Sequence, residues 1–281
     1  GNVCQEMAFA NGKVYIISQN GPKNGGEGLL TIADAKTLEK HKVINDATLA
    51  KDWPTHIAVV HSRIYLRGNS GIYRGTEEGS FKLIPGTEKA NKLRMVTIGE
   101  LVIATTSTNK LLVIQDEEVK QTFTLPEGSP SGLALAPDGQ LWLSYSKPNT
   151  LAKVSVSASG VKILDKHTTT QSLDKQWTAT SAIFARANQI FFTEQSSVIY
   201  RHDFSTGETK EIVDVQKVDK QAKMYYNSLG IDPKTGHIYY ASFGDYSTYK
   251  QNVTLVLDHD GKVLLKREHV NAFPAGFYFI P

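Results

Sequence analysis

The sequence predicts an all-β protein made of one repeated four-stranded unit, and two observations carry this prediction. The 281 residues are 40% hydrophobic and 21% charged, which is the composition of a folded globular protein. Short runs rich in Val, Ile, Tyr, Phe and Trp recur along the whole chain with turn residues between them. A chain of this size fits one large repetitive domain, so we expect residues 1–281 to form a single domain.

Six apolar runs share one pattern, in which two to four apolar residues open a strand after a turn. These runs are residues 14–17, 64–66, 101–103, 141–143, 190–192 and 238–240. Their first residues therefore recur every 37 to 50 positions. A period of about 40 to 50 residues that contains only strands is typical of propeller blades, whereas solenoid repeats of that length contain helices.

Each run is preceded by one short strand and followed by two more, so the repeat has four strands. The preceding strands are expected at residues 6–9, 56–59, 93–96, 132–135, 181–184 and 228–231. The first unit continues at residues 29–32 and 42–44, and the fifth at residues 198–201 and 209–213. Tight turns join the first two strands, most plainly at residues 137–139 and 232–236, because Gly allows positive φ and Pro presets φ. Four strands per unit make a propeller blade.

A seventh inner strand is expected at residues 272–279, which have the same small-residue start and aromatic finish. Nothing follows it, and propellers usually close by pairing the two chain ends in one blade. The predicted fold class is therefore an all-β, seven-bladed β-propeller of four-stranded blades with an incomplete last blade; six blades are the alternative. We expect the missing strands upstream of Gly1, which we interpret as the start of a processed form.

Charge, cysteine content and motifs exclude several classes of function. The 31 Lys and Arg residues and 28 Asp and Glu residues are interspersed, so no nucleic-acid footprint is present. No apolar run approaches the roughly 20 residues of a membrane helix, and the single Cys4 excludes an intrachain disulfide. Phosphate-binding loops, H-E-x-x-H, G-x-S-x-G and calcium loops are missing from the sequence. We therefore expect no cofactor, no metal site and no catalytic activity.

The functional surface of a propeller lies where its inner strands begin, around the mouth of the channel. Aromatic and polar residues occupy these positions and one long tyrosine-rich loop: Trp53, His56, Lys92, Trp177, Tyr225, Tyr226, Asn227, Tyr246 and Phe273. Large aromatics in such loops predict a bulky, partly apolar ligand, which Lys92 and Asn227 would orient. The alternative is that the aromatics pack as wedges between neighbouring blades.

Three segments resemble a known family. Residues 226–240 (YNSLGIDPKTGHIYY) resemble a late blade of the YncE-like propellers of Bacteroidetes, and residues 273–277 and 4–7 are similar to their DUF5074 subgroup. The resemblance implies an outer-membrane lipoprotein at the cell surface or in the periplasm, whose lipid anchor is not part of this chain. Relatives of this kind capture vitamin B12 and pass it to a TonB-dependent outer-membrane transporter.

Three functions follow as hypotheses. The first is non-catalytic capture of a small molecule, with a corrinoid as the candidate bound ligand and a TonB-dependent transporter as partner. The second is a lactonase-like hydrolase with a metal in the channel, for which only Glu6 and Asn227 are placed. The third is an interaction scaffold that binds a protein with the same face. We expect the first.

Overall fold

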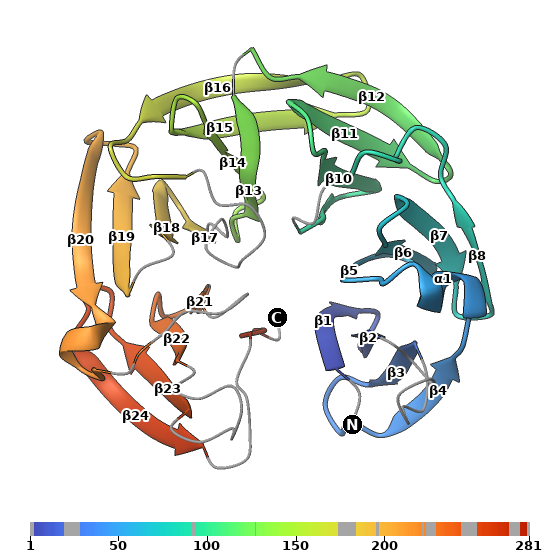
Figure 1. The fold of residues 1–281 in the computed structure, drawn as a ribbon, viewed down its shortest axis with the longest axis horizontal. Coiled ribbons are helices and arrows are strands. Elements are labelled where there is room, and N and C mark those ends of the chain that lie inside the picture. The colour runs from blue at the N-terminus through green and yellow to red at the C-terminus, as the bar shows by residue number, and fades with distance from the viewer. Residues whose placement is uncertain are drawn as a thin grey trace. The chain divides into compact units, whose positions relative to one another are not determined.

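A computed structural model describes residues 3–19, 29–90, 94–126, 128–173, 184–194, 197–220, 222, 229–242, 252–269 and 276–279. Within these residues the strands form six four-stranded sheets (Figure 1). In every sheet the strands are neighbours in chain order and pair antiparallel, so each sheet is a meander. This is the blade of a β-propeller, and the prediction of an all-β propeller with four-stranded blades is confirmed.

The sheets belong to two compact units, of which the first contains three sheets and the second most of the other three; residues 156–161 of the fourth sheet are assigned to the first unit. The first sheet consists of β1 (Val3–Ala10), β2 (Lys13–Gln19), β3 (Leu30–Asp34) and β4 (Lys40–Ile44). The second consists of β5 (His56–Val60), β6 (Arg63–Arg67), β7 (Ile72–Thr76) and β8 (Gly79–Leu83). The third consists of β9 (Val96–Ile98), β10 (Leu101–Thr105), β11 (Lys110–Gln115) and β12 (Glu118–Thr124). The short helix α1 (Ala47–Lys51) links the first and second sheets.

The second unit contains most of the other three sheets. The fourth consists of β13 (Ser129–Leu135), β14 (Leu141–Ser146), β15 (Thr150–Ser157) and β16 (Gly160–Thr168). The fifth consists of β17 (Phe184–Arg186), β18 (Gln189–Thr193), β19 (Val198–Asp203) and β20 (Glu208–Asp214). The sixth consists of β21 (Leu229–Ile231), β22 (Ile238–Ser242), β23 (Asn252–Leu257) and β24 (Val263–His269). A 3-10 turn, η3 (Val215–Lys217), follows β20. Neither described helix is long and apolar enough to cross a membrane.

The prediction of a seventh blade is wrong for the part of the chain that the structure describes, which contains six four-stranded sheets. Of the expected seventh inner strand, residues 276–279 are described and form no strand. The rings of Phe277 and Phe279 instead pack against Tyr239 of β22, with centroid distances of 5.5 and 5.2 Å. Residues 276–279 have the apolar composition of an inner strand because their side chains pack against another sheet, but these four residues form no strand.

Apolar side chains on both faces of the inner strands hold each unit together. All five residues of β10 and all six of β14 are buried. Within the first unit β1 contacts β5 and β5 contacts β9, and within the second β13 contacts β17 and β17 contacts β21. Consecutive sheets therefore share apolar clusters and stabilise one another, because a two-faced apolar sheet needs a neighbour on each side.

The predicted second strands are all confirmed, as β2, β6, β10, β14, β18 and β22. The first strand of the third sheet begins at Val96, three residues later than the predicted residue 93. Gly139 (φ 82°) and Gly236 (φ 76°) adopt the positive φ expected in the two tight turns. Helix α1 was not expected; it forms because the carboxylate of Asp46 accepts the N–H groups of Thr48 and Leu49.

A histidine pair joins the fourth and fifth sheets. Nδ1 of His167 on β16 lies 2.8 Å from Nε2 of the fully buried His202 on β19. The other ring nitrogen of His202 lies 2.8 Å from the Thr209 hydroxyl, and the His167 ring stacks on Phe204. Burial, and next the proximity of His167, lower the pKa of His202 from 6.5 to about 4.

We expect this histidine to make the protein less stable in mild acid. Because the pKa of His202 is lower in the folded chain than in the unfolded chain, the unfolded chain binds the extra proton first. The free energy of unfolding therefore falls as the pH drops from about 6.5 towards about 4. Urea unfolding across this range should show a shallower fall for His202→Gln than for the wild type. The exposed-histidine variant His41→Gln should keep the wild-type slope, and equal slopes for all three proteins would contradict the assignment.

Candidate functional site

The candidate site lies in the first unit, where β1, the N-terminal end of β5 and the segment before β9 meet. Its centre is the carboxylate of Glu6, a residue that is only 5% exposed. One oxygen, Oε2, accepts the backbone N–H of Ile57 at 2.8 Å, which ties β1 to β5. The other, Oε1, lies 3.3 Å from Nε of Arg94. Glu6 therefore connects all three sheets of this unit.

A buried arginine lies beside this carboxylate. Arg67, the last residue of β6, is 1% exposed, and its Nη2 donates to Nδ1 of His56 at 2.6 Å. The hydroxyl of Thr55 also lies 2.8 Å from that nitrogen. Because a guanidinium only donates, Nδ1 of His56 accepts, and a single proton of the neutral ring sits on Nε2. The backbone N–H of Thr55 donates to the carbonyl of Arg67 at 2.9 Å, so the strand pairing fixes both side chains.

Burial and opposite charges act against each other in this cluster. Desolvation raises the pKa of Glu6, while Arg94, the Ile57 N–H and Arg67 oppose the rise. Desolvation lowers the pKa of Arg67 to about 9, and Glu6 counteracts it. Arg67 is therefore still a cation at neutral pH, held away from water by the fold.

Trp53 is held at the surface immediately before this cluster. Trp53 is 45% exposed and has a left-handed φ of 55°. The preceding residue, Asp52, caps the end of α1, and its carboxylate accepts both the N–H and the hydroxyl of Ser70. A left-handed φ is costly for a bulky residue, and such conformations concentrate at functional sites. Trp53 is thus not a buried wedge between blades.

The structure places two of the predicted site residues, Trp53 and His56, in this region. The remaining seven lie outside the described residues: Lys92, Trp177, Tyr225, Tyr226, Asn227, Tyr246 and Phe273. Sequence reasoning missed Arg67 and Arg94, which follow or precede apolar runs like many ordinary flanking charges. One signal was available in the sequence, because Arg67 is a charged residue that directly follows the apolar run at residues 64–66. In the structure it is the last residue of β6 that pairs with β5.

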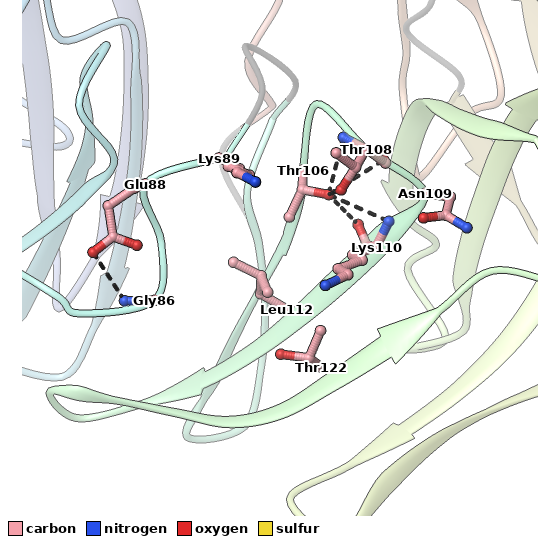
Figure 2. Close-up of a pocket in the computed structure, with 9 residues that line it drawn as sticks. All are labelled: Gly86, Glu88, Lys89, Thr106, Thr108, Asn109, Lys110, Leu112 and Thr122. Atoms are coloured by element: carbon pink, nitrogen blue, oxygen red, sulfur yellow. Dashed lines mark hydrogen bonds between the residues drawn. The ribbon is translucent and has the colours of Figure 1, made fainter.

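A hollow with a volume of about 350 Å³ lies elsewhere in the same unit, between the loop that follows β8 and the third sheet (Figure 2). Figure 2 shows that its polar groups bond to one another: the Thr106 hydroxyl lies 2.9 Å from that of Thr108 and accepts the Lys110 N–H. A carboxylate oxygen of Glu88 accepts the Gly86 N–H. The bonds of Thr106 hold the β10–β11 turn, the bond of Glu88 lies within the loop that follows β8, and we assign the hollow no function.

The described ranges contain no set of side chains that could bind a metal ion. No group of three His, Cys, Asp or Glu side chains there is arranged to hold a metal ion. Glu6, which the hydrolase hypothesis places as a ligand, has both oxygens engaged by Ile57 and Arg94. The cluster therefore suits charge recognition better than metal binding.

Comparison with known proteins gives a family and a fold. The family model "Domain of unknown function (DUF5074)" matches residues 1–280. A search of curated protein sequences found no match. Among solved structures, the chain is similar to a quinonprotein alcohol dehydrogenase-like protein from Bacteroides thetaiotaomicron, with 15% identity, a TM-score of 0.66, and coverage of 98% of this chain and 67% of that one.

Two further structures share the fold. Virginiamycin B lyase from Staphylococcus aureus is 14% identical, with a TM-score of 0.59 and coverage of 95% of this chain and 85% of the lyase. The computationally designed Ika8 protein is 10% identical, with a TM-score of 0.59 and coverage of 99% and 78%. At these identities the likeness concerns the fold alone.

Removing the charge of Glu6 should destabilise the protein strongly. Glu6→Gln keeps an acceptor for the Ile57 N–H but leaves Arg67 buried without its counter-charge, which should cost about 3 kcal/mol of unfolding free energy. Glu117→Gln is the matched control, because Glu117 pairs with Arg74 at the surface and is 60% exposed. That change should cost less than about 1 kcal/mol. Urea titration compares the two, and equal losses would show that Glu6 does not balance a buried charge.

Proposed function

The chain belongs to the DUF5074 family, and on that premise we propose that it is a non-catalytic propeller that captures a small molecule. The observation that carries the proposal is an exposed, strained Trp53 in the loop beside the buried charges of Glu6 and Arg67. The backbone of Asp52 bonds to Asn69 and that of Thr55 bonds to Arg67, so residue 53 lies next to the end of β6. An indole offers a flat apolar surface, and the charges beside it fix the orientation of a polar ligand.

The proposal includes a cellular role that the family resemblance supports. The ligand is a bulky nutrient, with a corrinoid such as vitamin B12 as the first candidate, and the partner is a TonB-dependent outer-membrane transporter. The protein would then work at the cell surface or in the periplasm, attached to the outer membrane through a lipid. A corrinoid fits the chemistry, because it combines a large apolar ring face with amide and phosphate groups.

Calorimetric titration with cyanocobalamin, its precursor cobinamide and haem tests the capture role. We expect saturable binding of at least one of these compounds by the metal-free protein. Elemental analysis of the purified protein, together with lactone hydrolysis assays, tests the competing hydrolase. Turnover that depends on a stoichiometric bound metal, with no binding of any compound in the panel, would overturn the proposal.

Replacing the exposed indole should weaken binding without weakening the fold. Trp53→Ala should reduce the affinity for the compound that binds by about thirtyfold, or about 2 kcal/mol, because it removes a large apolar contact. The melting temperature should hardly change, since the side chain is 45% exposed. Trp53→Phe should retain most of the affinity, and Leu38→Ala, at an exposed turn residue, should leave both quantities unchanged. Normal binding by Trp53→Ala would place the site elsewhere.

A further inference from the structure

We propose that Arg67, supported by Arg94, is the binding site for an oxyanion group, a carboxylate or a phosphate, of the captured molecule. This inference rests on the proposed function, because it names the chemical group that the same site recognises. It requires a ligand with at least one negatively charged oxygen group beside its apolar surface.

The guanidinium of Arg67 has donors that the described part of the protein does not use. Nη2 donates to His56, whereas Nε and Nη1 are buried and have no hydrogen-bond partner there. Nε carries one N–H and Nη1 carries two, so three of the five N–H groups of this side chain lack an acceptor. Buried N–H donors normally have an acceptor, and each buried donor without an acceptor costs free energy. An oxyanion offers the acceptors that these donors lack.

The Glu6 carboxylate does not supply the acceptors that Arg67 lacks. The oxygens of Glu6 already accept from Ile57 and lie against Arg94, so Glu6 does not complete the shell of Arg67. A bound oxyanion would pair the buried cation, which is the arrangement that buried charges require.

The residues around Arg67 fix the orientation of its guanidinium before a ligand binds. His56 accepts from Nη2, and that acceptor is itself held by the Thr55 hydroxyl. His56 and Arg67 lie opposite each other in the β5–β6 pairing. A guanidinium that is fixed before binding loses little side-chain entropy on binding, which favours affinity.

The repeat shows that the fold does not need an arginine at this place. Near the ends of the corresponding second strands, the other five sheets bury a small hydroxyl side chain: Ser18, Thr105, Ser146, Thr193 and Ser242. Only the second sheet buries an arginine there. A buried arginine is an expensive replacement for a hydroxyl, so a role in binding accounts for it better than packing does.

Part of the cluster and its neighbouring loop reach the surface. The Arg94 side chain is 24% exposed, and Trp53 is 45% exposed two residues before Thr55.

Arginine side-chain NMR on the wild-type protein tests the inference without any substitution. Protein labelled with 15N-arginine is titrated with sodium phosphate, with sodium acetate and with sodium chloride at matched ionic strength. We expect the Nε–Hε resonance of Arg67 to shift saturably, in the millimolar range, with phosphate or acetate and not with chloride. Whichever of the two is stronger identifies the group. An unmoved resonance, or an equal shift with chloride, would mean that water satisfies these donors and would overturn the inference.

Two variants separate this inference from the capture role. Arg67→Met, checked for folding by circular dichroism, should abolish the response to phosphate and acetate, and lower the affinity for any anionic compound that binds in calorimetry at least tenfold. Arg201→Met removes the same charge from a partnered, 18% exposed arginine of the fifth sheet and should change neither. Undiminished binding by a folded Arg67→Met would overturn the oxyanion site and leave the capture role standing. An Arg67 response to phosphate without binding of any larger compound would do the reverse.

Discussion

The two-faced burial of the inner strands is the constraint on which the rest of this protein depends. Strands such as β10 and β14 are buried along their whole length, so every sheet needs apolar neighbours and no sheet is stable alone. Polar chemistry is excluded from the middle of these strands because an unpaired buried polar group is costly. Function is therefore expected mainly at the strand ends and in the loops that join them, where Arg67 and Trp53 lie, whereas Glu6 lies within β1.

Glu6 is the exception that makes the strand ends of the first unit work together. Its carboxylate replaces a ladder partner by accepting the Ile57 N–H from the next sheet, and it faces Arg94 from the sheet after that. The same negative charge makes it possible to bury Arg67 at all, since an isolated guanidinium would be too costly. One carboxylate thus joins three sheets and creates the electrostatic conditions for a buried cation.

Much of the fold could be predicted from the sequence, because β-period apolar runs between Gly- and Asp-containing turns leave little choice of structure. All six second strands follow from that pattern. The prediction of a seventh blade is wrong because residues 276–279 have the composition of an inner strand, and composition does not reveal that Phe277 and Phe279 pack on Tyr239 without strand pairing. The charge cluster was out of reach for another reason: residues 6, 67 and 94 come together only when three sheets have packed.

Repetition itself explains why the site is found where the repeat is broken. A structure built from similar sheets satisfies each sheet in the same way, and a small hydroxyl near the end of the second strand is compatible with that packing in five sheets. A residue that departs from the repeat must be stabilised locally, as Arg67 is by His56 and Glu6. Departures of this kind from a local packing rule are expected at functional sites. In this protein the departure lies beside the strained Trp53, so two costly features coincide at one strand end.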